Sequence, residues 1–314
     1  MTNQSQAVTD ILGITYPIVQ APMNWVTNAS FVAAVSNAGG LGVLGPNAGQ
    51  HQGYSPEETY TKMREEIQKT KALTDKPFGI NILLPNNPFT QALLDVGLDE
   101  GVAVFVTVGD ADPEVFERIK DDGKRILHRP LEPTSQAMQD AERLGADVLV
   151  ATGYDEGGVI PARLIGTFTI VPAMVDAVSI PVLAAGGIND RRGVQAAYAL
   201  GASGVYMGSR FLMTQESPMA ENVKQALLTA KNEDMLLVAK QQRSLRTDFA
   251  QSLKENYTSE EASVQNTQVI RERGGVRAGM LEGDLVNGII SLNTGIEIIQ
   301  DLPSVADLIA HLMG

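Results

Sequence analysis

The chain has 314 residues, of which 44% are hydrophobic and 19% charged, as in water-soluble globular proteins with one large α/β domain or two smaller ones. Its formal net charge of −13 argues against nucleic acids and acidic membranes as partners. The absence of cysteine excludes disulfides and thiolate metal sites, and the three histidines lie too far apart in the sequence to indicate a metal site.

Eight short apolar runs alternate with amphipathic helical patterns. Helices are expected at residues 28–38, 56–71, 113–121, 135–144, 169–178 and 191–200. Strands that are apolar on both faces, each followed by a helix, predict parallel βαβ units. Eight such units favour an α/β fold of the (β/α)₈ TIM barrel type over an open doubly wound sheet. The eight runs are "PIVQAPM", "GLGVLG", "FGINILLP", "VAVFVTVG", "RILHRP", "DVLVATG", "PVLAAGG" and "GVYMGS".

The alternation stops after the eighth run. Residues 215–285 are polar and mainly helical in pattern, and the sequence then returns to apolar helices. We therefore predict a barrel formed by residues 1–214 and 286–314, with 215–285 as a small helical domain inserted after strand 8 and packed over one barrel end.

The segment "GLGVLG" at residues 40–45 matches the G-x-G-x-x-G fingerprint of dinucleotide-binding folds. That fingerprint requires a preceding strand and a following helix. Here the glycines follow a predicted helix and span a predicted strand. The segment is therefore interpreted as a glycine helix end followed by a tightly packed strand.

Two glycine turns follow the seventh and eighth predicted strands, at "AAGGIND" and "YMGSRF". Each brings bare backbone amides to the start of a helix, where Asn189 or Asp190 can cap the helix after strand 7. In barrel enzymes the loops after strands 7 and 8 commonly hold a phosphate group. The pair of turns therefore predicts a phosphate site.

Other side chains are expected at the same barrel end. Asn81 interrupts an apolar strand and needs a partner, either a neighbouring backbone group or a ligand. Met23 could contact a flat ring or simply fill the core. Asp155 and Glu156 are adjacent, so they should point to opposite sides, one toward the site and one toward solvent, and should not form an acid/base dyad. His128, at the end of strand 5, stands where barrel enzymes place catalytic groups.

These segments resemble the flavin-dependent nitronate monooxygenases, formerly 2-nitropropane dioxygenases, and the related FMN-type enoyl-acyl-carrier-protein reductases. The resemblance runs from "YPIVQAPM" and "NAGGLGVLG" through "ERLGADVLVATGYDEGG" to "GVRAGMLEGDLVNG". It implies an FMN-binding barrel with a small inserted domain. The candidate FMN-binding residues are Ala21, Met23, Asn81, Thr152, Asp155, Gly157, Gly158, Gly186, Gly187, Tyr206, Met207, Gly208 and Ser209.

The sequence departs from the family pattern at two places. The family commonly has a histidine after the double glycine of strand 6, and this chain has Val159. The common G-Q-x-x-G pattern near the end is reduced to "SLNTG", which keeps only Gly295. We hypothesise that His128 or Tyr154 supplies the missing proton or hydrogen bond.

The resemblance implies oxidation of alkyl nitronates by O₂ through FMN. One alternative is an NAD(P)H-dependent reductase of enoyl thioesters or quinones. Two others are a phosphosugar-type barrel enzyme without flavin and a catalytically silent flavoprotein. We expect a cytoplasmic, metal-free enzyme with a small-molecule substrate, because no apolar run is long enough for a membrane span and "MTNQSQAVTD" lacks signal-peptide features. The use of NAD(P)H and the formation of a homodimer stay open.

Overall fold

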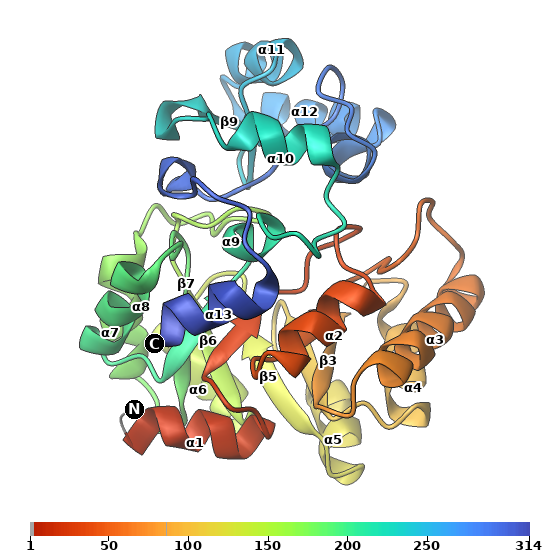
Figure 1. Ribbon diagram of the computed structural model, residues 1–314, viewed down its shortest axis with the longest axis vertical. Coiled ribbons are helices and arrows are strands. Elements are labelled where there is room, and N and C mark those ends of the chain that lie inside the picture. The colour runs from red at the N-terminus through yellow and green to blue at the C-terminus, as the bar shows by residue number, and fades with distance from the viewer. Residues whose placement is uncertain (1–2, 86) are drawn as a thin grey trace.

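The eight apolar runs form eight parallel strands that close into a barrel at the centre of the molecule (Figure 1). The computed structural model describes residues 3–85 and 87–314. Neighbouring strands follow the order β1-β8-β7-β6-β5-β4-β3-β2, and an isolated parallel bridge between Val19 and Leu41 links β1 to β2. The predicted (β/α)₈ barrel is confirmed. The strands are β1 (Ile18–Gln20), β2 (Gly42–Leu44), β3 (Phe78–Leu83), β4 (Val104–Val108), β5 (Arg125–Arg129), β6 (Val148–Thr152), β7 (Val182–Ala185) and β8 (Gly204–Met207).

Side chains alternate between the two faces of each strand, and both faces are buried. Val106 and Leu127 belong to an apolar cluster inside the barrel, whereas Phe105 and Ile126 belong to a cluster between the strands and the helices. This double burial explains why the strands are apolar at nearly every position. It also fixes which residues at the strand ends can face the interior.

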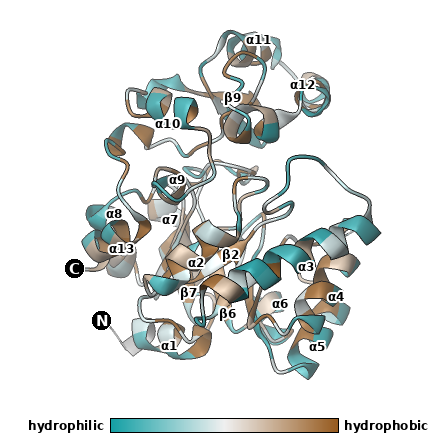
Figure 2. Cartoon of the chain, turned by 45° about the vertical axis from the view of Figure 1, so that its right-hand side comes forward, coloured by the Kyte–Doolittle hydropathy of each residue, from teal (hydrophilic) through white to brown (hydrophobic). Residues whose placement is uncertain are grey.

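Helices surround the strands, and α3 presents a largely hydrophilic surface (Figure 2). The predicted helix over 113–121 coincides with α5, which Asp112 caps through the N–H groups of Glu114 and Val115. The predictions did not include α1 or α4. The helix α1 places Val8 and Leu12 in the inner cluster and so closes one barrel end. The helices are α1 (Asn3–Leu12), α2 (Ala29–Asn37), α3 (Pro56–Leu73), α4 (Thr90–Asp99), α5 (Pro113–Asp121), α6 (Ser135–Arg143), α7 (Thr167–Val175), α8 (Arg191–Ala199) and α9 (Ser209–Leu212).

After α9 the chain builds a layer above the barrel and then returns as α13, which packs on α2 and α8 (Figure 1). This layer contains a β-hairpin, β9 with β10, that the sequence patterns did not indicate. The elements are α10 (Glu221–Leu227), η1 (Asn232–Asp234), β9 (Met235–Ala239), β10 (Gln242–Leu245), α11 (Asp248–Asn256), α12 (Glu260–Glu272), the π-helical η2 (Arg277–Leu281), η3 (Ile296–Ile298) and α13 (Val305–Met313).

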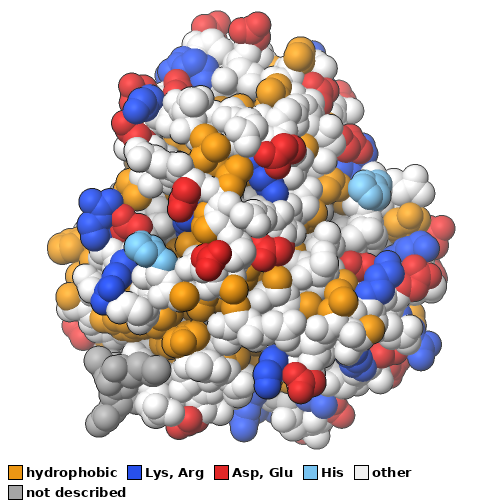
Figure 3. Space-filling model, in the orientation of Figure 1, with side chains coloured by type: hydrophobic (Ala, Val, Ile, Leu, Met, Phe, Trp, Pro, Cys, Tyr) orange, Lys and Arg blue, Asp and Glu red, His pale blue; other side chains and the backbone are white. Residues whose placement is uncertain are grey.

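The segment "GLGVLG" joins a helix to a strand as expected. The helix α2 ends at Asn37, and β2 spans Gly42–Leu44. Acidic and basic side chains are interspersed on the face seen in Figure 3. In the part of the chain that the structure describes, no helix has both the length and the apolar character required to cross a membrane.

Candidate functional site

The glycine turns after β7 and β8 lie side by side at the carboxyl end of the barrel. The register that pairs Ala185 with Tyr206 brings Gly186 and Gly187 alongside Gly208. Gly186 and Gly187 have φ angles of 105° and 69°, which favour glycine. Among the hydrogen bonds between described residues, none uses the N–H of Gly187 or Gly208. Free N–H groups on neighbouring loops are the donors that a bound phosphate requires.

The open side of Gly208 faces the end of β1. A Cβ built on Gly208 would lie 3.5 Å from Met23 Sδ and 3.8 Å from Ala21 Cβ. A side chain there would fill the space beside these two groups. A thioether and a methyl group suit the face of a flat ring, and the free amides suit a phosphate. The residues present therefore fit FMN, and Ala21, Met23 and Gly208 are brought together as predicted.

A pair of asparagines joins the β7 turn to the segment that returns from the insert. The Asn189 and Asn293 side-chain amides donate to each other, with distances of 3.0 and 2.7 Å. Asn293 N–H also donates to Ser209 Oγ at 2.8 Å, and Asp190 caps α8. The sequence patterns did not indicate Asn293, because its partners lie far away along the chain. The hydroxyl of Ser209 thus supports the site by holding this segment.

Polar side chains line the interior at the same end of the barrel. Asn81 Nδ2 donates to the Val106 carbonyl at 2.7 Å, so the backbone supplies the partner that this amide needs. Arg129 follows the inward-facing Leu127 by two residues and donates through Nε to Thr152 Oγ1 at 3.1 Å. The Tyr206 side chain also belongs to the inner cluster, and burial raises the pKa of its phenol.

The carboxylate that reaches this interior is Glu156. It forms an ion pair with Arg129, and its side chain is 14% exposed. Burial raises the pKa of Glu156 to about 7, although the neighbouring Arg129 acts in the opposite direction. The Asp155 side chain points away from the Glu156 side chain, as expected for adjacent residues. However, its carboxylate accepts the Thr167 N–H at 2.6 Å at the start of α7, which corrects the expectation that the second carboxylate faces solvent.

Three other predicted cofactor residues have structural contacts instead. A Cβ on Gly157 would lie 2.5 Å from the Leu292 backbone, and Gly158 N–H donates to Ser291 Oγ at 3.0 Å. Gly157 thus packs against the returning segment, and Gly158 is hydrogen-bonded to it. The Met207 side chain lies in the outer cluster, because it alternates with the inward Tyr206. The Met207 carbonyl accepts the Ala21 N–H at 2.9 Å, so this residue joins β8 to the end of β1.

The insert contributes a side chain to the barrel mouth. The Arg243 guanidinium carbon on β10 lies 4.3 Å from the centre of the Tyr154 ring, and Nη1 donates to the Glu156 carbonyl at 2.5 Å. Tyr154, which we predicted to be catalytic, therefore contacts the insert. Val159, at the position of the family histidine, is 53% exposed and pairs with Gln242 in an isolated bridge.

His128 lies on the wrong face of β5 for catalysis at the barrel mouth. Its ring packs edge-on against Phe116 of α5, with centroids 5.3 Å apart, and Nδ1 lies 2.9 Å from Thr107 Oγ1. Strand alternation turns Arg129 inward and His128 outward. The prediction of a catalytic His128 is therefore wrong.

Replacing His128 with glutamine is expected to leave turnover and FMN content unchanged but to alter acid stability. Burial lowers the pKa of His128 to about 4. The unfolded chain takes up this proton below about pH 6.5, so the folded state loses about 3 kcal/mol as the pH falls toward 4. Urea unfolding at several pH values should show that the free energy of unfolding depends less on pH in the variant than in the unmodified protein. A loss of turnover with intact fold and flavin would contradict this placement.

Several known proteins are similar to this chain over most of its length. A dehydrogenase from Rhodococcus jostii, named for a hydroxy-methyl-oxo-octahydroindene-carboxyl-CoA substrate, is 31% identical and covers 98% of this chain and 95% of its own. A probable nitronate monooxygenase from Staphylococcus haemolyticus is 34% identical over 79% of this chain and 80% of its own. FabK from Thermotoga maritima is 32% identical, with a TM-score of 0.87 over 98% of this chain and 94% of its own. The family model described as "Nitronate monooxygenase" matches residues 5–314, and the chain therefore belongs to the nitronate monooxygenase family of oxidoreductases.

Proposed function

We propose that the chain is an FMN-dependent oxidoreductase that acts on an acyl thioester, with Glu156 as the proton-transferring residue. The observation that carries the proposal is the largely buried Glu156 carboxyl beside Arg129, with a pKa raised to about 7. A group that titrates near the working pH can both take and give a proton. The two relatives named as carboxyl-CoA dehydrogenases, which span 98% of the chain, support this substrate class.

When bound, FMN supplies the hydride chemistry. The chain's own residues have the other tasks. The free amides of Gly187 and Gly208 bind the phosphate, and Met23 contacts the ring. Arg129 holds the Glu156 carboxyl toward the barrel interior through their ion pair. When a hydroxyl carbon of the substrate loses a hydride, the hydroxyl proton goes to Glu156. In the reductive direction, Glu156 returns a proton to the substrate.

The insert contributes Arg243 to the surroundings of Glu156. Its side chain is buried, and its contact with the Glu156 carbonyl ties β10 to the loop after β6. By covering Tyr154, it limits the access of water to the carboxyl. A water-poor surrounding keeps the pKa of Glu156 raised.

Oxidation of alkyl nitronates by O₂ is the second candidate. The guanidinium groups of Arg129 and Arg243 near the mouth suit an anionic substrate, and several relatives are named as probable nitronate monooxygenases. A nitronate is already ionised, so its oxidation needs no base. Nitronate oxidation makes no use of the raised pKa of Glu156. We therefore place this function second.

Anaerobic reduction of the purified yellow protein tests whether it acts on thioesters or on nitronates. A hydroxyacyl-CoA is expected to bleach the flavin absorbance, and the corresponding ketoacyl-CoA should restore the colour after reduction with NADPH or dithionite. The nitronate of 2-nitropropane is the comparison substrate. Bleaching by the nitronate alone would overturn the thioester assignment in favour of the second candidate. A preparation that is colourless and does not take up FMN would overturn both.

A further inference from the structure

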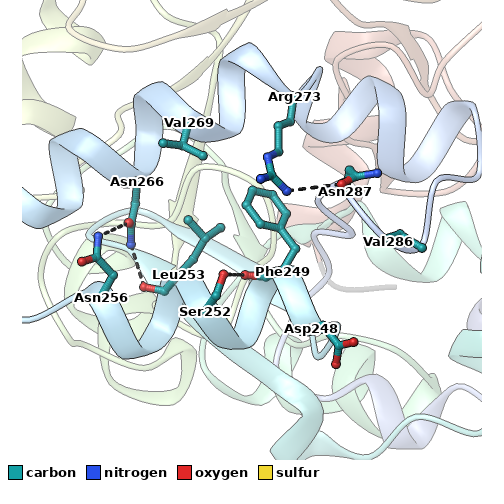
Figure 4. A pocket seen from close by; sticks show the side chains of 10 residues that line it. All are labelled: Asp248, Phe249, Ser252, Leu253, Asn256, Asn266, Val269, Arg273, Val286 and Asn287. Carbon is teal, nitrogen blue, oxygen red and sulfur yellow. Dashed lines mark hydrogen bonds between the residues drawn. The ribbon is translucent and has the colours of Figure 1, made fainter.

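Two of the cavities lined by described residues lie outside the barrel mouth, and the second of them has a buried polar side chain without a partner among those residues. The first, of about 410 Å³, lies between α11 and α12 (Figure 4). The buried polar side chain that lines it, Asn266, is satisfied within the insert. Asn266 donates to the Val238 and Leu253 carbonyls, and Arg273 donates to Asn287. The contacts within the insert therefore account for this first cavity.

The second cavity is a groove of about 480 Å³ beside the loops that follow β1 and β2. Helices α2 and α3 form one side of it, and Pro218 and Leu281 of the insert border the other. The groove and the candidate FMN site are neighbours in the sequence. Trp25, which lines the groove, follows Met23 of the FMN site by two positions. The groove has no part in the reaction proposed above.

Gln50 lines this groove, and its carboxamide has no partner among the described residues. The residue is only 5% exposed, and both Nε2 and Oε1 are buried without a hydrogen bond. A buried polar group left in this condition destabilises a fold, and a ligand that pairs with it removes that cost. A carboxamide offers one donor and one acceptor side by side, which is the pattern that pairs with the donor and acceptor edge of adenine.

Trp25 lines the same groove and can stack on a flat base. Its φ of 69° is unusual for a bulky residue, and its N–H donates to the Pro46 carbonyl at 3.1 Å. The Arg277 guanidinium carbon lies 5.9 Å from the indole centroid. Stacking of a base on an aromatic ring stabilises a complex, because both partners present a flat face.

The charges around the groove are already balanced by neighbours. The Glu66 carboxylate accepts the Ala29 N–H at 2.7 Å and pairs with Lys69 at 3.0 Å. Arg277 pairs with Glu282. The groove therefore has little surplus charge to select a phosphate, and its open hydrogen-bonding capacity is that of Gln50. A neutral heterocycle fits this chemistry better than a bare anion does.

We infer that this groove binds the adenine end of the nucleotide that carries the substrate or the reductant. The inference rests on the proposed function, because a CoA thioester and NAD(P)H both end in adenine. The nucleotide would place its base between Trp25 and Gln50 and extend past Met23 toward the barrel mouth.

Trp25 is the only tryptophan in the chain, so its fluorescence reports directly on the groove. The FMN-loaded protein would be titrated with ADP, CoA and NADPH, with GDP as the control. We expect a saturable change with the adenine nucleotides and a weaker response to GDP. A higher affinity for CoA assigns the groove to the substrate, and a higher affinity for NADPH assigns it to the reductant. No saturable change, or equal affinity for GDP, would overturn the inference.

Gln50→Leu is expected to weaken binding about tenfold, the effect of losing one well-made hydrogen bond, without lowering the unfolding temperature. Gln50→Glu, which keeps the shape but removes the donor, should weaken binding as well. Gln52→Leu, an exposed glutamine in the same loop, is the matched control. Unchanged binding in both Gln50 variants would overturn the inference even if thioesters reduce the flavin. Nucleotide binding without thioester turnover would instead contradict the proposed function alone.

Discussion

Replacing Glu156 with glutamine is expected to lower kcat about 10²- to 10⁴-fold, the usual contribution of a positioned acid or base. The variant keeps the size of the side chain and its ability to bond Arg129, but it cannot exchange a proton. The inflection near pH 7 in the rate profile should disappear with it, since burial raises the pKa of Glu156 to about 7. Steady-state kinetics with a thioester substrate across the pH range measure both effects.

The sign of the pH dependence differs between the two directions. Oxidation of a hydroxyl needs the carboxylate form, so the rate should rise as the pH increases through about 7. Reduction needs the protonated form, so the rate should fall above the same pH. The matched control is Asp155→Asn, which changes the adjacent carboxyl that accepts the Thr167 N–H. It should lower stability but keep the inflection. An inflection that persists in Glu156→Gln would show that another group carries the proton.

The strands could be predicted because their signals are local. Each apolar run is bounded by glycine, proline or polar residues, and all eight predicted runs contain the observed strands. The helix α5 was also found at its observed limits, because Asp112 and Pro113 mark its start in the sequence. Fold class therefore followed from short patterns that repeat along the chain.

The orientation of side chains was harder to predict. In strands that are apolar on both faces, the pattern does not show which face is inside. His128 was therefore chosen at the end of β5, whereas its neighbour Arg129 faces the interior. Leu127 is the signal that could have resolved this. Once one strand position is assigned to the interior, the residue two positions later lies there too.

Contacts between distant segments were not accessible from the sequence. The α7 helix begins at Thr167, two residues before its predicted start, because the Asp155 carboxylate accepts that N–H. The bond between Asn189 and Asn293 likewise joins residues 104 positions apart. The hairpin of β9 and β10 was missed because its strands are short and only partly apolar. Such features depend on the closed barrel, which must be known first.

Replacing Gly208 with alanine is expected to weaken FMN binding about ten- to hundredfold while the barrel stays folded. The added methyl would meet Met23 Sδ at 3.5 Å and Ala21 Cβ at 3.8 Å, which are ordinary contacts that the protein tolerates. The same methyl would occupy the space beside the free N–H of Gly208. A charge-assisted hydrogen bond to a phosphate contributes about 1.5–3 kcal/mol, which sets the expected loss.

Two measurements separate an effect on the candidate phosphate site from an effect on the fold. The flavin content of the purified variant and its FMN dissociation constant should change, whereas its far-UV circular dichroism should not. Gly53→Ala is the matched control, because a Cβ at Gly53 has no heavy atom within 4 Å. Gly186 and Gly187 are less suitable, since their positive φ angles strain any side chain. Full FMN binding in a folded Gly208→Ala variant would place the phosphate elsewhere. The proposed site consists of bare backbone in the turns after β7 and β8, and a methyl group added there must separate the ligand from the N–H groups.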